Sequence, residues 1–234
     1  MKQQLVIVPG WDGTKESWKK FIDLAKEDFE VRIVELPCFG DVPCPETVWG
    51  VKEYANYVKN KINDLQKPIL LGHSFGGQIA VDLVVNNPDL FSKLILSGAA
   101  VMRPKYSLKR VLFLLIAKIG KAVFSLPLLN RLSNFAKKVL YKTADSPDYN
   151  KTSKIKREIF KKVIRQSQAH LLPKIKIDTL VVWGNRDSYV PLEEGQKIAD
   201  LIPGAQLKII FGGKHGLHIQ QPEALLRTIR DFLK

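Results

Sequence analysis

Short apolar segments alternate with segments of helical periodicity along most of this 234-residue chain, and this alternation constrains the fold more than any other feature. The apolar segments are continuous, which is typical of parallel strands buried on both faces. We therefore predict an α/β fold, a mostly parallel sheet of about six strands with helices on both faces. The strands are expected at residues 4–8, 31–36, 68–71, 93–96, 179–183 and 206–211, and the helices at 15–26, 47–65, 76–85, 192–201 and 222–233.

A long basic segment interrupts this alternation. From Arg103 to Lys176 the chain carries 19 basic and 3 acidic residues, a net charge of +16, whereas the whole chain carries +14. We expect residues 103–170 to form an inserted basic helical cap, and residues 1–102 and 171–234 to form the core that carries the sheet. One amphipathic helix of this segment is expected to present the apolar stripe Ile155, Ile159, Val163 and Leu171.

The pentapeptide Gly72-His73-Ser74-Phe75-Gly76 follows an apolar run and opens a helical pattern. A serine at such a sharp strand-to-helix turn is exposed as a nucleophile, provided that its neighbours leave room for a strained backbone. Gly72 and Gly76 leave this room because neither carries a side chain. Pentapeptides of this form also arise by chance, so the position between strand and helix is what favours Ser74 as a nucleophile over an incidental serine in a glycine turn.

A serine hydroxyl becomes an effective nucleophile only when a base removes its proton, so a histidine has to lie nearby. Of the four histidines, His73 adjoins Ser74 with its side chain directed away from it, and His170 belongs to the basic segment. His215 and His218 follow the last strand, at the edge of a parallel sheet where functional residues gather. We favour His215 as the base because it directly follows a glycine-rich turn, and we expect His218 to pack under the C-terminal helix.

The other members of a catalytic site have candidates too. Asp187 lies just beyond the fifth expected strand, where it could orient the base. Alone it would be interpreted as a turn-forming residue, but its place between Ser74 and His215 in the chain, after a strand, favours a catalytic role. A developing oxyanion needs two N–H donors, and the candidates are the backbone amides of Phe75 and Trp11. The Trp11 side chain is expected either to line an acyl pocket or to pack in the core.

Four segments resemble the α/β-hydrolase superfamily, in its small, cap-bearing, esterase-like branch: VPGWDGT, LLGHSFGG, TLVVWGNRDSYVP and GGKHGLHIQQPE. In that family the catalytic histidine precedes the proline of a Pro-Glu pair by seven residues, as His215 precedes Pro222. The resemblance implies a triad of Ser74, Asp187 and His215, a cap between the fourth and fifth strands, and no metal or cofactor. The family's usual His-Gly in the oxyanion loop is Pro9-Gly10 here, which leaves the placement of Trp11 open.

The resemblance implies a serine hydrolase that cleaves carboxylic esters, with a small or medium acyl ester or a lactone as substrate. Thioesterases and carbon–carbon bond hydrolases share the triad and stay open as alternatives, as does a ligand receptor that keeps the fold and binds partners through the cap. Dehalogenases and epoxide hydrolases use an aspartate nucleophile, and Ser74 argues against both. Aminopeptidase relatives bind a substrate ammonium with acidic cap residues, and a basic cap would repel it.

The basic segment admits three interpretations: a solvated face, attraction of an anionic substrate, and weak contact with an anionic membrane surface. Nucleic-acid binding is not expected, because no recognition motif accompanies the charge. The sequence has no apolar run that could cross a bilayer and no signal peptide, so we expect a cytoplasmic protein; its oligomeric state stays open. Cys38 and Cys44 are six residues apart, and free thiols are favoured over a local disulfide in that compartment.

Overall fold

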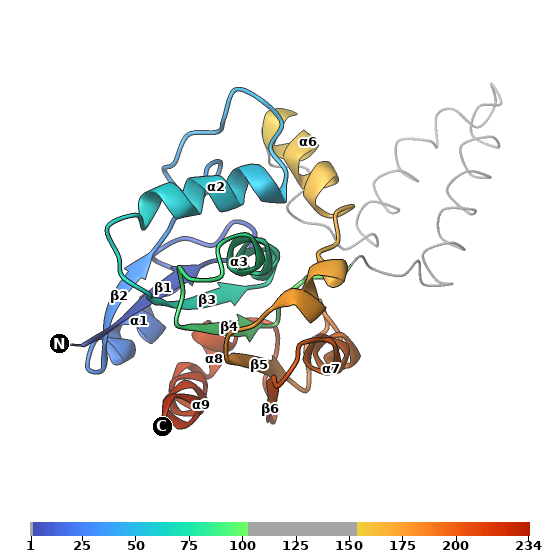
Figure 1. Cartoon of the computed structure of the whole chain (residues 1–234). Coiled ribbons are helices and arrows are strands. Elements are labelled where there is room, and N and C mark those ends of the chain that lie inside the picture. The colour runs from blue at the N-terminus through green and yellow to red at the C-terminus, as the bar shows by residue number, and fades with distance from the viewer. Residues whose placement is uncertain (1, 103–153) are drawn as a thin grey trace, which may run out of the picture. The chain divides into compact units, whose positions relative to one another are not determined.

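The computed structural model describes residues 2–102 and 154–234, and its centre is a six-stranded sheet in which each strand is parallel to its neighbours (Figure 1). The strand order is β2-β1-β3-β4-β5-β6, so all carboxyl ends meet along one edge of the sheet. The predicted α/β fold is confirmed. The bounds are β1 Gln3–Val8, β2 Phe29–Ile33, β3 Ile69–His73, β4 Lys93–Ser97, β5 Thr179–Gly184 and β6 Gln206–Ile210.

Helices cover both faces of this sheet (Figure 1). One face is covered by α1 (Lys19–Ala25), α8 (Leu217–Gln220) and α9 (Pro222–Leu233), which contact one another. The other is covered by α2 (Val51–Lys61) and α3 (Phe75–Asn86), while α7 (Leu192–Leu201) packs against β5 and β6. The described chain resumes after residue 153 with α6 (Lys154–Val163) and a short 3₁₀ helix, η1 (Ala169–Lys174).

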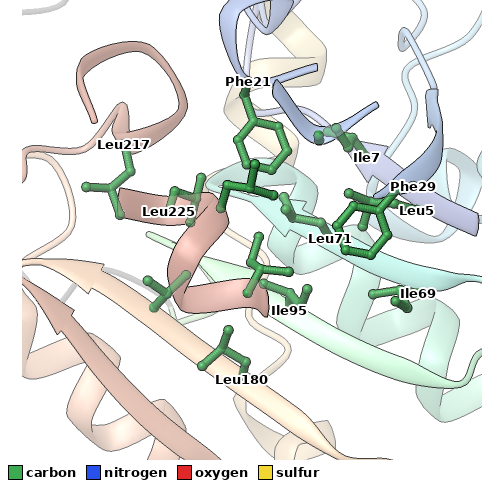
Figure 2. Packing of buried hydrophobic residues seen from close by; sticks show 14 of the residues in the cluster. Leu5, Ile7, Phe21, Phe29, Ile69, Leu71, Ile95, Leu180, Leu217 and Leu225 are labelled. Atoms are coloured by element: carbon green, nitrogen blue, oxygen red, sulfur yellow. The ribbon is translucent and has the colours of Figure 1, made fainter. Parts of the chain in front are cut away.

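Alternate strand residues point into a large apolar cluster beneath α1, α8 and α9 (Figure 2). Leu5 of β1 and Leu71 of β3 are completely buried there, against Phe21 of α1 and Leu225 of α9. Burying one such side chain is worth about 1.5–3 kcal/mol. The intervening residue Val6 is also completely buried, on the opposite face of β1. Burial on both faces explains why the strands are continuously apolar in the sequence.

The helix and strand ends differ from the predicted ones for local reasons. The helix predicted at 47–65 starts at Val51, because the Glu53 carboxylate accepts a hydrogen bond from the Gly50 N–H (2.6 Å) and closes the first turn there. The helix predicted at 15–26 starts only at Lys19, since reciprocal hydrogen bonds between Thr14 and Ser17 shape the preceding residues into a turn. The second strand occupies Phe29–Ile33 rather than 31–36.

The amphipathic helix predicted for the basic segment is shorter than its apolar stripe implied. Ile159 and Val163 are buried as expected, but α6 ends at Val163 and Leu171 lies in η1. Beyond the helix, the Gln168 N–H donates to the carbonyl of Val101 (3.0 Å), so the chain leaves the helical path to pair with the segment after β4. This hydrogen bond is a tertiary contact, so the spacing of apolar residues along the chain cannot predict that the helix ends before it.

The chain separates into two compact units, residues 1–103 with 158–234, and residues 104–157. Most of the second unit lies outside the described residues. The expected cap over residues 103–170 therefore stays a prediction, together with its boundaries. Among the described helices, none is long and apolar enough to cross a membrane.

Cys38 and Cys44 form a disulfide that closes the loop after β2, so the expectation of free thiols was wrong. The loop turns back on itself through hydrogen bonds from the Cys38 N–H to the carbonyls of Val42 (3.1 Å) and Pro43 (3.3 Å). This turn brings the Cα atoms of the two cysteines to 4.1 Å, a proximity that a spacing of six residues does not disclose. Phe39, inside the closed loop, is completely buried.

Candidate active site

Ser74 occupies the turn between β3 and α3. Its backbone has a positive φ of 51°, which costs about 1–3 kcal/mol for a residue with a side chain. The turn is also crowded: a Cβ at Gly72 would lie 2.6 Å from the carbonyl oxygen of Gly76, and a Cβ at Gly76 would overlap the carbonyl of Val8. Close approach therefore requires glycine at both positions, as expected for a turn that exposes a nucleophile.

Hydrogen bonds hold this strained turn from both sides. The N–H of Ser74 donates to the carbonyl of Ser97, the last residue of β4, at 3.2 Å. The carbonyl of Ser74 accepts from the N–H groups of Gly77 and Ala100, each at 3.0 Å. The backbone of Ser74 is thus tied to α3, to β4 and to the segment after β4, and it cannot relax without breaking these bonds.

Asp187 and His215 form a hydrogen-bonded pair at the same edge of the sheet, after β5 and β6 respectively. Oδ2 of Asp187 lies 2.7 Å from Nδ1 of His215. The other carboxylate oxygen, Oδ1, accepts hydrogen bonds from the N–H groups of Tyr189 and Val190, each at 2.8 Å. The Asp187 side chain is only 1% exposed and that of His215 18%. This carboxylate is therefore fixed by its own loop and directed at the imidazole.

Gly98 is a site residue that the sequence analysis missed. It follows β4, has a positive φ of 52°, and its N–H donates to the carbonyl of Val182 (3.2 Å). A Cβ here would lie 3.2 Å from Nδ1 of His215 and 3.4 Å from Oδ2 of Asp187. The Asp187–His215 pair thus packs directly on Gly98, and Ser97 beside it holds the N–H of Ser74. The only sequence signal was a glycine after a strand.

The two candidate oxyanion donors adjoin the elbow. Phe75 is the first residue of α3, so its N–H has no partner within the helix and lies at the positive end of the helix dipole. Trp11 follows β1, and the loop carrying it passes close to the turn: a Cβ at Gly10 would lie 3.0 Å from the Cβ of Ser74. The rings of Trp11 and Phe75 are 5.8 Å apart between centroids.

The Trp11 ring belongs to an aromatic group next to the elbow. Its centroid lies 4.8 Å from that of Phe39 in the disulfide-closed loop and 4.9 Å from that of Phe160 on α6. The ring is half-buried, whereas Phe39 and Phe75 are buried. These contacts form an aromatic cluster next to Ser74, built from four separate segments of the chain.

The remaining histidines differ sharply in environment. His73 is buried, and burial together with the nearby His218 and His215 holds its pKa well below the usual value. His218 lies on α8, where its ring stacks on that of Trp18 with centroids 3.9 Å apart. Burial, followed by the influence of His215, lowers the pKa of His218 to about 3. His170 is exposed on η1. Both buried imidazoles are therefore neutral at pH 7.

In the ranges 2–102 and 154–234, no group of three or more His, Cys, Asp or Glu side chains is placed to hold a metal ion. Residues 5–228 match the model of the alpha/beta hydrolase family. The chain belongs to the alpha/beta hydrolase family. The match spans the elbow, the Asp187 loop and the His215 loop, which agrees with the resemblance seen in the sequence.

Within this family, the chain is 27% identical to the uncharacterized hydrolase YugF of Bacillus subtilis (strain 168), covering 100% of this chain and 90% of that protein. It is 24% identical to a pimeloyl-[acyl-carrier protein] methyl ester esterase of Neisseria meningitidis serogroup C, covering 99% and 94%. The crystal structure of the enol-lactonase of Burkholderia xenovorans LB400 has the same fold, with a TM-score of 0.75 at 19% identity, covering 100% of this chain and 92% of that one.

Proposed function

We propose that this protein is a serine hydrolase that cleaves carboxylic esters, with a small or medium acyl ester or a lactone as substrate. Ser74 attacks the carbonyl carbon, His215 is the base, Asp187 orients His215, and the amides of Trp11 and Phe75 stabilise the oxyanion. The observation that carries the proposal is the 2.7 Å contact between Asp187 and His215 at the sheet edge where Ser74 occupies its strained turn.

The Asp187 contact determines which nitrogen of His215 can act. A carboxylate accepts a hydrogen bond, so Nδ1 of His215 carries the proton and the lone pair lies on Nε2. Nε2 takes the proton of Ser74 as the hydroxyl oxygen bonds to the substrate carbonyl carbon. The imidazolium then gives this proton to the leaving alcohol, and an acyl-enzyme remains on Ser74. Water, activated by the same nitrogen, releases the acid and restores the serine.

The kinds of relative found support this reaction class. One curated relative over nearly the full chain length is a methyl ester esterase, and one structure of the same fold is an enol-lactonase. Ester and lactone hydrolysis share the steps above, since a lactone is a cyclic ester whose leaving alcohol stays attached to the acyl group. The identities of 24% and 19% carry over no substrate, so the proposal names only the bond that is cleaved.

The test is the Ser74→Ala variant assayed with a short p-nitrophenyl ester and with a panel of esters, lactones and thioesters. Turnover should fall by ~10⁴ or more, because the nucleophile is lost. Ser92→Ala is the matched control, since Ser92 is exposed at the opposite end of β4, and it should retain full activity. Near-full activity of Ser74→Ala would refute the assignment. Ligand binding by the wild type without multiple turnover would instead indicate a receptor.

A further inference from the structure

His73 is a buried polar side chain that touches both halves of the proposed site without taking part in the chemistry above. Its Nδ1 lies 2.8 Å from the carbonyl oxygen of Ser97. Its ring centroid lies 4.8 Å from that of His215, with the planes inclined by 45°. The side chain therefore reaches from the end of β3, next to Ser74, to the proposed base.

The carbonyl of Ser97 accepts two hydrogen bonds, which uses both lone pairs of that oxygen. One comes from the N–H of Ser74 at 3.2 Å, and the other from Nδ1 of His73. His73 and Ser97 are directly paired in the β3–β4 register, so the imidazole bonds to the residue opposite it on the neighbouring strand. The side-chain bond consequently holds the acceptor that positions the backbone of the nucleophile.

The same ring also forms part of the surroundings of His215. The contacts of the His215 imidazole include the Asp187 carboxylate at Nδ1, the Tyr189 ring at 5.3 Å between centroids, Gly98, and the ring of His73. Behind His73 lie His218, at 4.8 Å between centroids, and Trp18, at 5.9 Å. The His73 ring thus lies between the rings of Trp18 and His218 on one side and the proposed base on the other.

Packing alone does not account for an imidazole here. A buried polar ring costs free energy that a phenyl ring of similar size would not, unless its N–H is paired. The bond to Ser97 supplies that pairing, and it requires the proton on Nδ1. With burial holding its pKa well below the usual value, the ring stays neutral and does not repel the imidazolium that forms on His215.

We propose that His73 is a positioning residue that keeps Ser74 and His215 in register for proton transfer, through its hydrogen bond to Ser97 and through the support that its ring gives to the His215 imidazole. This inference rests on the proposed function. It predicts that both contacts matter, and two substitutions separate them. His73→Asn keeps an N–H near the position of Nδ1 but removes the ring, while His73→Phe keeps a ring but removes the donor.

The experiment measures kcat and KM of both variants with a p-nitrophenyl ester, per active site titrated with a fluorophosphonate. Each variant should lose about 10–100-fold in kcat with KM within twofold of wild type, because misplacement by a fraction of an ångström slows proton transfer without weakening binding. Titration counts only active sites that react, so misfolded protein does not enter kcat. If His73 acted only by stabilising the fold, its loss would lower the number of active sites but leave kcat per site unchanged. His170→Asn, at the exposed histidine of η1, is the matched control and should behave as wild type.

A loss in kcat of less than tenfold in either variant overturns the proposal. If His73→Phe does not fold, His73→Gln is compared with His73→Asn instead. Both variants lack the ring, but the longer amide of Gln cannot place a donor at the Nδ1 position, so His73→Gln should lose more kcat than His73→Asn. Failure of this inference and failure of the proposed function are distinguishable. Active His73 variants beside an inactive Ser74→Ala would refute only the role of His73, whereas an active Ser74→Ala would refute the function itself.

Discussion

Oδ2 of Asp187 lies 2.7 Å from Nδ1 of His215, while Oδ1 of the same carboxylate is held by two backbone N–H groups of its own loop. The carboxylate therefore cannot rotate without losing hydrogen bonds, and one oxygen always faces the imidazole. Among residues 2–102 and 154–234, this contact is the hydrogen bond that fixes the tautomer of His215.

Replacing Asp187 by Asn tests this relationship. The amide oxygen can still accept from Tyr189 and Val190, but the NH₂ group then faces Nδ1 of His215 and favours the tautomer with the proton on Nε2. That tautomer cannot act as the base, so kcat should fall by ~10³–10⁴ with little change in KM. Steady-state kinetics of Asp187→Asn against Asp178→Asn, an exposed carboxylate paired with Lys93, measures the effect. Equal activity of the two variants would contradict it.

Gly98 gives a second prediction, with an internal control. In Gly98→Ala the new Cβ would lie 3.2 Å from Nδ1 of His215 and 3.4 Å from Oδ2 of Asp187, so the pair has to shift. We expect kcat to fall about 10–100-fold. The positive φ should also cost about 1–2 kcal/mol of stability.

The control for this prediction is Gly204, which has a positive φ of 71° with nothing within 4 Å of its Cβ position. Gly204→Ala should therefore lose similar stability in urea unfolding but no activity; the same activity loss in both variants would refute a local effect.

The sequence could locate Ser74, Asp187 and His215 because each lies just past the end of an apolar strand. Parallel strands bring these ends to one edge of the sheet. The position of a residue just after a strand therefore predicted the contact between Asp187 and His215, which are 28 positions apart in the chain. The chemical roles of the three residues remain predictions. The contact of Asp187 and His215 with Gly98 could not be foreseen, since it depends on how the loops after β5 and β6 pack onto the end of β4.

Two other features could not be predicted from the sequence, because one lies in a very short helix and the other depends on a tertiary contact. His218 was expected to pack under the C-terminal helix, but its stacking on Trp18 was not foreseen, because α8 has only four residues, too few for any periodicity. The disulfide between Cys38 and Cys44 depends on a turn held by backbone hydrogen bonds, whereas the preference for free thiols rested only on the expected compartment. In both cases the sequence shows the residues but not the geometry that makes them partners.

The disulfide leads to a stability prediction. Closing a loop this short restricts the unfolded chain by about 2 kcal/mol, so reduction should lower the free energy of unfolding by that amount. Urea unfolding with and without a dithiol reductant measures it. The Cys38→Ser/Cys44→Ser double variant is the control, because its unfolding should not respond to the reductant. Since Phe39 in this loop contacts Trp11, a parallel loss of the proposed hydrolase activity is expected on reduction. Identical unfolding midpoints with and without reductant would contradict the prediction.

His218 leads to a prediction on pH. Its pKa is lowered from the usual 6.5 to about 3 in the folded protein, first by burial and then by His215. Between these values the unfolded chain binds a proton that the folded chain does not, so stability is lost as the pH falls below about 6.5, by about 1.4 kcal/mol per pH unit. His73, whose pKa is lowered in the same direction, adds to this slope.

Urea unfolding between about pH 4.5 and 6.5 measures this slope above the range in which most carboxylates titrate. His218→Phe keeps a ring to stack on Trp18 but removes the titrating group, so its slope should be shallower by about 1.4 kcal/mol per pH unit. An unchanged slope in this variant would show that His218 is not the buried neutral imidazole described above.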